Sequence, residues 1–346
     1  MPSLSTRQGG GSLAQFLAKR MLFLVPVAIA VTLITFVVTR VIPANPAQLA
    51  AGLRAGPEQV EQLRRNMGLD KPLYVQYVNY LKGLVRGDFG SSMRTRQPVI
   101  RDILRYFPAT AELALVTMLI LVMVGIPFGI LTATTRRSVD VAVRSLSIGI
   151  TALPTFWLAL VLQFFFFFKL RWLPALGQIS SEGLLPAHPT HFYILDSVIT
   201  GRLGALPDVL LHMVMPVSAL VAGRLAIVVR MTRAALLEEL RQEYVRTARA
   251  KGLGESGVLL RHALRNSLIP IVTELGLHMG WLLGGAVFVV ELIFSWPGIG
   301  LYAIKSIMAL DYMPIMGTTL IMTLIFVIIN LLVDVSYTFL NPRIRY

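Results

Sequence analysis

An all-α, polytopic membrane protein is the fold class that this sequence predicts. Of its 346 residues, 55% are hydrophobic and only 14% are charged. Soluble domains carry about 25% charged residues, so the composition argues against a water-soluble fold. Apolar runs recur along the chain, and each approaches the length of about 20 residues with which a helix crosses the hydrocarbon core. We therefore expect several membrane-spanning helices.

Six apolar runs are long enough to serve as spans. They cover residues 21–41, 110–134, 145–168, 213–229, 268–292 and 315–339. The first run follows Lys19 and Arg20 and is longer than the apolar core of a secretory signal, roughly 7–15 residues. We interpret it as a signal-anchor, with cleavage near the Ala-rich NPAQLAAG segment as the weaker alternative.

A polar segment follows the first span. Within residues 42–107, PEQVEQLRRNMGL and PLYVQYVNYLKGLVRG have helical spacing, and Gly68 and Gly87 are suited to end the two helices. We expect a small folded insertion here. The chain is accordingly divided into 1–107 (tail, first span and insertion), 108–340 (five further spans) and 341–346 (a short tail).

The basic residues predict the orientation. Lys and Arg exceed Asp and Glu by 32 to 18, and in a membrane protein this excess usually lies in cytoplasmic loops beside anionic lipid. Cations are dense before residue 20, around Arg136 and Arg137, between 230 and 265, and after 342. Both termini and the 243–270 stretch are therefore expected in the cytoplasm. Membrane lipid is an expected partner and nucleic acid is not.

The stretch 243–270, EYVRTARAKGLGESGVLLRHALRNSLIP, differs sharply from the apolar runs on either side. Residues 239–251 lack Pro and Gly and favour a helix, which Gly252 and Gly254 are expected to end. A second helical piece, 256–266, leads to Pro270, which suits the first turn of a further helix. We predict two short helices with a glycine joint, a construction that suits a loop moved by another protein.

No motif supports chemistry on this chain. It has no Cys and no GxxxxGK[ST] phosphate loop, so thiolate metal sites, a Cys nucleophile and its own nucleotide hydrolysis are not expected. GESG at 254–257 has no partner His or Asp arranged around it. His188 and His191 could share a metal, but HPTH is more often a turn. No cofactor, metal or catalytic residue is assigned.

Few polar residues fall within the apolar runs. Most are near predicted ends, where they reach the interface; Arg224, Glu274 and His278 are expected to be deep. Deep charged groups usually line a cavity or pair with one another. Glu274, His278 and Glu291 are therefore candidates for a translocation path, and a packed His278 is the alternative. An ion-coupled carrier would need a fuller set.

Several motifs together resemble the permease subunits of dipeptide, oligopeptide and nickel ABC importers. They are GLDKPLYVQY, FPATAEL, ALPTFWLAL, IVVRMTRAALLEEL, YVRTARAKG with HALRNSLIP, ELIFSWPGIG and the terminal NPRIR. They recur in order over nearly the whole chain. The chain departs from the general EAA signature of ABC permeases, since Arg246 and Thr247 replace its glutamate and first alanine and the proline comes at 270.

The resemblance implies a six-helix type I importer permease, with a MetI-like core and a coupling helix that docks on a cytoplasmic ATPase. It implies coupling roles for the matching loop residues, which are Tyr244, Arg246, Thr247, Ala248, Arg249, Lys251 and Gly252. Ala248 and Gly252 would allow close approach to the ATPase. The implied partners are a second permease subunit, two ATPase subunits and an extracytoplasmic solute-binding protein, in a bacterial inner membrane.

Two other functions remain open. A secondary peptide carrier would transport without any ATPase, and an intramembrane hydrolase would need paired Ser–His or Asp–Asp residues that the spans do not offer. The cargo is undecided among dipeptide, longer peptide, glutathione, opine, nickel chelate and sugar oligomer. Whether the second permease is an identical copy is also undecided.

Overall fold

The computed structural model describes residues 13–41, 46–52, 55–134, 149, 151–185 and 189–340. Within these ranges the chain forms helices and no β-strand; one isolated antiparallel bridge joins Ser91 to Pro98. The expected all-α fold is confirmed.

The first half contains these helices: α1 (Leu13–Val41), α2 (Pro46–Ala51), α3 (Pro57–Asn66), α4 (Leu73–Val85), α5 (Val99–Ile120), η1 (Leu121–Gly125), α6 (Ile126–Thr134), α8 (Thr155–Leu162) and η2 (Gln163–Lys169). The second half contains η3 (Glu182–Leu184), α9 (Tyr193–Ile199), η4 (Leu203–Ala205), α10 (Leu206–Glu239), α11 (Glu243–Ala250), α12 (Glu255–Gly257), η5 (Val258–Ala263), α13 (Leu264–Trp281), η6 (Leu282–Ala286), α14 (Val287–Ile293), α15 (Ile299–Met308) and α16 (Tyr312–Leu340).

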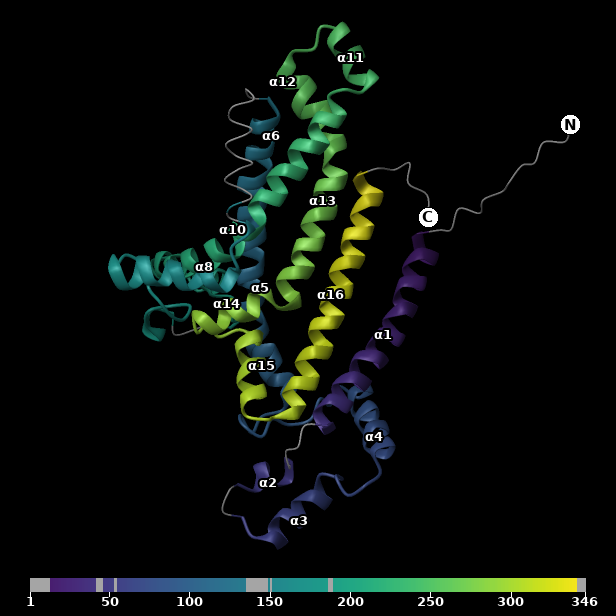
Figure 1. The fold of residues 1–346 in the computed structure, drawn as a ribbon, viewed down its shortest axis with the longest axis vertical. Coiled ribbons are helices and arrows are strands. Elements are labelled where there is room, and N and C mark those ends of the chain that lie inside the picture. Colours follow the sequence, from purple (N-terminus) through teal and green to yellow (C-terminus); the bar gives the residue numbers. More distant parts are fainter. Residues whose placement is uncertain are drawn as a thin grey trace, which may run out of the picture.

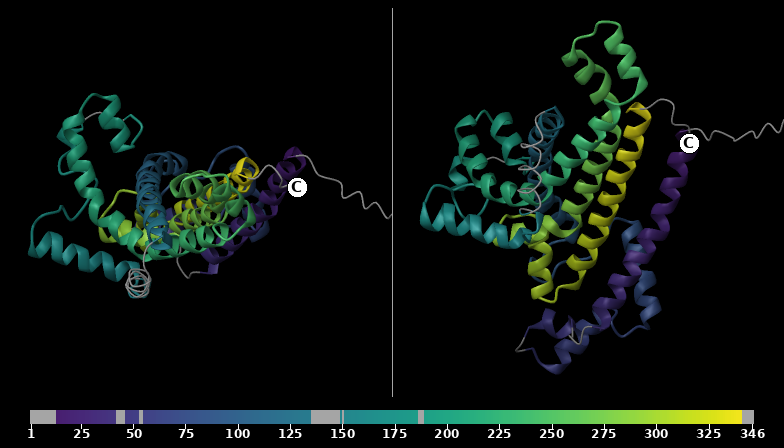
Figure 2. Two further views of the ribbon diagram at one scale, coloured as in Figure 1. Left: turned by 90° about the horizontal axis from the view of Figure 1, so that it is seen from above. Right: turned by 45° about the horizontal axis from the view of Figure 1, so that its top comes forward.

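Long helices lie side by side in a bundle (Figure 1). α10 packs against α5, α6 and α13; α13 packs against α16, and α16 against α1. α11 and α12 lie at one end of the bundle, and α2, α3 and α4 lie at the other. Seen from above, α8 extends to one side of the bundle and α1 lies at the opposite side (Figure 2). The basic loop and the polar insertion are thus at opposite ends.

Five helical segments within the described residues are long and apolar enough to cross a membrane. They are Arg20–Arg40, Val99–Thr134, Leu203–Glu239, Glu255–Ile293 and Tyr312–Ser336. The third predicted run, 145–168, lies partly outside the described residues, and its described part, Thr155–Lys169, is a shorter apolar helix. The predicted count of six is therefore approximate.

The span boundaries differ from expectation in two places. The second span begins at Val99, well before residue 110, because the residues before FPATAEL continue the same helix through Pro108. Pro270 does not open a helix: it lies inside α13, and the helix beginning at Glu255 runs on through it as the fifth span. The second predicted piece, 256–266, is helical but continuous with the fifth span. The basic stretch therefore holds one separate short helix, α11, and the prediction of a new helix opening at Pro270 was wrong.

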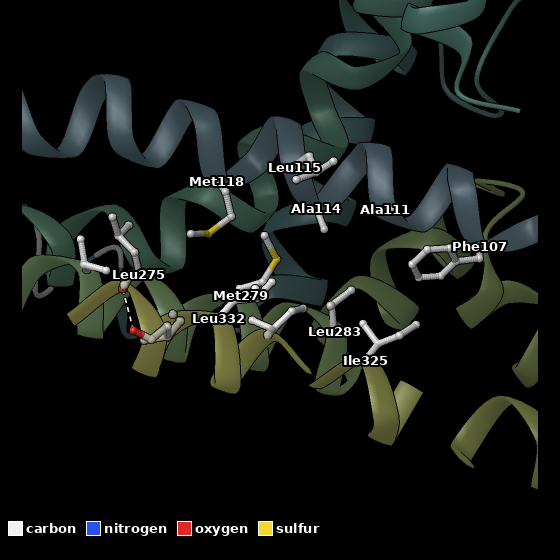
Figure 3. Close-up of a pocket in the computed structure, with 15 residues that line it drawn as sticks. Phe107, Ala111, Ala114, Leu115, Met118, Leu275, Met279, Leu283, Ile325 and Leu332 are labelled. Carbon is white, nitrogen blue, oxygen red and sulfur yellow. Dashed lines mark hydrogen bonds between the residues drawn. The ribbon is translucent and has the colours of Figure 1, made fainter. Parts of the chain in front are cut away.

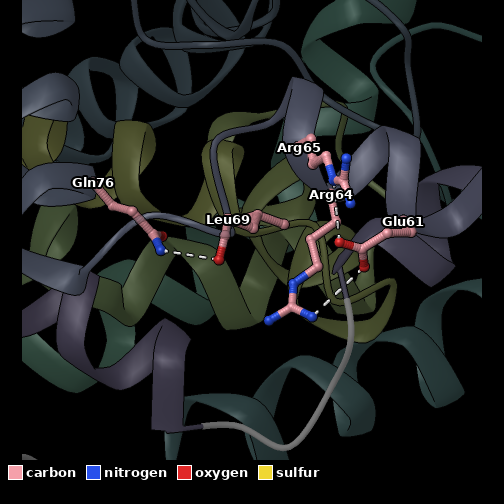
Figure 4. A network of polar contacts seen from close by, with 5 residues as sticks. All are labelled: Glu61, Arg64, Arg65, Leu69 and Gln76. Atoms are coloured by element: carbon pink, nitrogen blue, oxygen red, sulfur yellow. Dashed lines mark hydrogen bonds and ion pairs between the residues drawn. The ribbon is translucent and has the colours of Figure 1, made fainter.

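The insertion after the first span is folded as expected. α3 and α4 match the two predicted helical pieces, and Gly68 and Gly87 follow them with φ of 64° and 79°, a left-handed conformation that favours glycine. The amide nitrogen of Gln76 donates to the carbonyl of Leu69 across this turn (Figure 4). Arg64 and Arg65 pair with Glu61 on the exposed face of α3, where such pairs stabilise little.

Pairs of glycines bring the long helices together. Gly125 and Gly129 face α10 so closely that a Cβ on Gly129 would come within 2.5 Å of the Cβ of Thr232. Gly276 and Gly280 of α13 approach α16 in the same way. In a membrane, small residues four positions apart allow such close helix packing, which is stabilised by van der Waals contact rather than by the hydrophobic effect. These G-x-x-x-G pairs fix the bundle around α10 and α13.

Candidate functional site

The separate helix α11 joins the ends of two spanning helices. The helix predicted over 239–251 is interrupted at 240–242: α10 ends at Glu239 and α11 begins at Glu243. Gly252 follows α11 with φ of 80°, and its N–H and that of Leu253 bond back to the carbonyls of Arg249 and Ala248. This left-handed glycine ends the helix, as expected.

One face of α11 packs against its own chain. Val245 and Ala248 are buried and contact Val258 at the start of the fifth span. Tyr244 packs against this small cluster, and its hydroxyl donates to Oε2 of Glu239 at 2.6 Å. Burial, and after it this hydrogen bond, raises the pKa of Tyr244 to about 12. The hydroxyl therefore stays protonated and can donate the hydrogen bond to Glu239. α11 is thereby held against α10 and η5.

The opposite face of α11 is cationic and exposed. Arg246, Thr247, Arg249, Lys251 and Gly252 are exposed on it or just after it. Arg246 pairs with Glu243 at 2.7 Å within the helix. Arg249 makes two bonds to Glu255, of 2.8 and 3.1 Å, and so bridges the turn to α12. These contacts leave a positively charged helix face at the end of the bundle.

The seven predicted coupling residues therefore divide between two faces. Five are exposed, whereas Ala248 and most of Tyr244 face inward. Ala248 shares a small buried cluster with Val258 of η5. Its small size therefore has an explanation within the chain, beside the expected close approach to a partner. The coupling role of all seven stays a prediction.

A second polar group lies between α10 and α13. Glu274, His278 and Trp281 share one face of α13, four and three residues apart. Nδ1 of His278 is 3.6 Å from Oε1 of Glu274, and the Arg224 guanidinium of α10 lies 4.1 Å from the centre of the Trp281 ring. His278 is buried and Glu274 is partly exposed. The structure brings two of the three predicted path residues together and adds Arg224 beside them.

Glu291, the third predicted path residue, lies elsewhere and is fully buried. Its carboxylate accepts hydrogen bonds from the Thr110 hydroxyl at 2.6 Å and from the N–H groups of Gly300 and Leu301 at 2.7 and 3.0 Å. These two N–H groups begin α15, where a carboxylate is well placed to satisfy the free donors of a helix. The position favours a structural role, and a place on the path stays a prediction.

The FPATAEL motif supplies a second such contact. The carboxylate of Glu112 accepts from the N–H groups of Tyr193 and Ile194 at 3.2 and 2.7 Å, at the start of α9. Glu112 is buried; it was expected near the end of its span, where it could reach the interface, and the earlier start of the helix at Val99 explains the difference. Two carboxylates on different spans thus hold the first turns of two connecting helices.

An apolar pocket of about 490 Å³ opens between α5, α13 and α16 (Figure 3). Phe107, Met118, Leu275, Met279 and Ile325 are among its lining residues. It occupies the face of α13 opposite Glu274 and His278. Its nearly complete lack of polar lining means that it offers nothing to hold a charged group.

Metal and hydrolytic chemistry gain no support from the described residues. No three residues among His, Asp and Glu lie together as a metal site in the part of the chain that the structure describes. His188 falls outside the described residues, so the alternative of a His188–His191 site stays untested. GESG at 254–257 comprises the N-cap residue Gly254 and the whole of α12.

Two family models match most of the chain. The model described as "Binding-protein-dependent transport system inner membrane component" matches residues 125–346. The model for the N-terminal part of such membrane components matches residues 13–114.

Individual proteins match over nearly their full length. The dipeptide transport system permease protein DppB of Alkalihalophilus pseudofirmus is 40% identical over 95% of this chain and 98% of its own. The probable D,D-dipeptide transport system permease protein DdpB of Escherichia coli is 42% identical over 93% and 94%. The glutathione transport system permease protein GsiC of Shigella boydii is 37% identical over 96% and 99%.

Proposed function

Because the chain belongs to the family of binding-protein-dependent transport system inner membrane components, we propose that it moves short peptides into the cytoplasm as the permease subunit of an ATP-driven importer. Three similar permeases are named for transport of a dipeptide, a D,D-dipeptide and glutathione. All three cargoes are small and peptidic, so a short peptide is the cargo that the similarity favours.

The observation that carries the proposal is the position of α11. It is a short, exposed, cationic helix at one end of the bundle, joined directly to two membrane-spanning helices (Figure 1). Contacts from Tyr244 and Arg249 fix it to both neighbours. A push on α11 would therefore pass to α10 and α13 as a movement of rigid elements, which is what coupling to an ATPase requires.

The cationic face supplies the docking chemistry. Arg246 and Lys251 are exposed, and the pair of Arg246 with Glu243 is itself exposed and therefore weak, so both cations could pair with an acidic rim on a partner ATPase. ATP hydrolysis belongs to two such partner subunits, since this chain carries no phosphate loop. A second permease would complete the path, and a solute-binding protein would deliver cargo at the end formed by α2, α3 and α4. Both termini would then be cytoplasmic.

The test is purification of the tagged full chain from its native membrane, followed by an ATPase assay of the accompanying subunits. Arg246→Glu and Lys251→Glu reverse charge on the exposed face and leave the inward contacts of Val245 and Ala248 in place. We expect an ATPase to co-purify with the wild-type chain. The amount of co-purified ATPase should fall about tenfold or more in the two variants. Ala248→Glu would be a poor choice because it would unpack α11 itself.

Arg64→Glu is the matched control, since it reverses an exposed charge on α3 at the opposite end of the bundle. It should keep the ATPase. If the wild-type chain purifies alone and peptide uptake continues in cells without any ATPase, the importer is excluded and the secondary carrier takes its place.

A further inference from the structure

A small, partly polar pocket of about 200 Å³ lies where the first span meets the insertion. Its lining comes from five segments: the end of α1, the turn after α3, α4, the loop after α4, and the start of α16. Arg40 contributes a positive charge and Asp88 a negative one, and α4 contributes polar groups from Gln76, Asn79 and Tyr80. Neither the coupling role of α11 nor the path residues of α13 involve this pocket.

Three lining side chains have buried polar atoms without a hydrogen-bond partner. They are Nε of Arg40, Oε1 of Gln76 and the hydroxyl oxygen of Tyr80. The amide nitrogen of Gln76 donates to the carbonyl of Leu69 (Figure 4) and to that of Lys71, so its oxygen is the atom without a partner. Buried polar groups almost always have partners, and three such atoms around one cavity point to a bound group.

The unused atoms define the chemistry of that group. Arg40 offers N–H donors and a positive charge. Asp88, the acidic lining residue, accepts from the N–H of Gly90, and within the described residues it does not lie at ion-pair distance from Arg40. Burial raises the pKa of Tyr80 above its ordinary value, so its hydroxyl stays protonated and can donate. Gln76 Oε1 can only accept. The pocket thus suits an anionic oxygen group next to a hydroxyl or amine donor.

The position of the pocket relates it to the bilayer. Arg40 is the last residue of the first candidate span, Arg20–Arg40. Leu33 and Val37, seven and three residues before it on the same side of α1, are 45% and 48% exposed. An apolar chain attached to the anionic group would therefore have free apolar surface beside the pocket.

We propose that this pocket binds the phosphodiester headgroup of a membrane phospholipid. The phosphate faces Arg40 and Tyr80, the headgroup hydroxyl or amine donates to Gln76 Oε1, and the acyl chains lie along Leu33 and Val37. The pocket volume of about 200 Å³ is several times the roughly 30 Å³ that one water occupies. The pocket therefore has room for a group larger than a single water, such as a phosphodiester headgroup. The lipid would tie the first span to the insertion.

The test uses the full chain, purified in detergent with the subunits that accompany it and then stripped of lipid. Thermal stability is measured with three probes: dioctanoyl phosphatidylglycerol, dioctanoylglycerol without phosphate, and inorganic phosphate. Native mass spectrometry counts retained lipid before stripping. We expect retained phospholipid and a stabilisation of several degrees by the phospholipid probe alone.

Arg40→Met should reduce retained lipid about fivefold or more and abolish the thermal shift. Tyr80→Phe changes one atom without altering the ring, and it should weaken the shift even if Arg40→Met folds poorly. Arg64→Gln, an exposed cation on α3, should behave as wild type. Equal stabilisation by inorganic phosphate would overturn the lipid assignment, and no shift with any probe would mean that the pocket holds only water and would overturn the site.

Discussion

The hydroxyl of Thr110 donates a 2.6 Å hydrogen bond to the carboxylate of Glu291, 181 residues away in the sequence. Oγ1 of Thr110 also accepts from the N–H of Ile299 at 2.7 Å. The N–H of the Trp296 indole donates to the carbonyl of Ala109 at 3.0 Å. The second span is therefore locked to the turn between α14 and α15 by polar contacts in a fully buried site.

Loss of the carboxylate charge should destabilise this junction. Glu291→Gln replaces one carboxylate oxygen with an amide N–H₂ next to two backbone N–H groups and the Thr110 hydroxyl, so one or more buried donors lose their acceptor. The expected cost is about 1–3 kcal/mol, observed as a lower midpoint of thermal unfolding in detergent. Glu58→Gln, on the exposed surface of α3, should leave the midpoint unchanged.

A double-mutant cycle separates the pair from its surroundings. Thr110→Val removes the donor and keeps the shape of the side chain. Combined with Glu291→Gln, it should cost less than the sum of the two single changes, because the residues share one network. Strict additivity would show that the two residues do not stabilise the junction together.

Close packing of α6 on α10 predicts a marked response to one methyl group. In Gly129→Ala the new Cβ would meet the Cβ of Thr232 and the carbonyl of Val229, so the helices must separate. The expected loss is about 1–3 kcal/mol, measured by thermal unfolding. Gly257→Ala, also helical but with open space around it, should be neutral or slightly stabilising; equal effects at both sites would contradict the packing explanation.

Composition and apolar periodicity were sufficient to predict the helical class, the insertion and most spans. They did not place the helix boundaries, because apolar runs measure hydrophobicity and a helix can continue through polar residues, as α5 does before residue 110. Pro270 was misread for a related reason. Proline favours a first turn, but within a membrane bundle neighbouring helices can accommodate it inside a helix.

Local sequence also could not reveal which residues meet across the fold. Thr110 and Glu291 stand in two motifs that supported the family resemblance, yet nothing within either motif indicates that they bond. Arg40, Gln76 and Tyr80 gave no signal as a group, because they converge only when the insertion folds back on α1. The G-x-x-x-G spacings at 125–129 and 276–280 were readable in advance and are the signal that sequence reasoning overlooked.

The turn after α11 gives a prediction about local order. Gly252 has φ of 80°, so Gly252→Ala introduces backbone strain of about 1 kcal/mol even though nothing crowds the new methyl group. Gly254 has φ of −63° and is equally uncrowded, so Gly254→Ala should be tolerated. Hydrogen exchange of residues 249–255 should accelerate in the first variant only. Faster exchange in both variants would show that the turn depends on the backbone flexibility of its two glycines, rather than on the left-handed conformation of Gly252.

The polar face between α10 and α13 predicts a separation of transport from assembly. Glu274 lies close to His278 and acts electrostatically on Arg224, within a span where charged groups usually line a cavity or pair. If these residues contribute to the path, Glu274→Gln and His278→Gln should slow peptide uptake about five- to tenfold, which is a barrier change of about 1–1.4 kcal/mol. The partner ATPase should still co-purify, since α11 is untouched. Glu238→Gln, exposed near the end of α10, should leave uptake unchanged, and loss of the ATPase together with uptake would show that Glu274 and His278 stabilise the bundle instead.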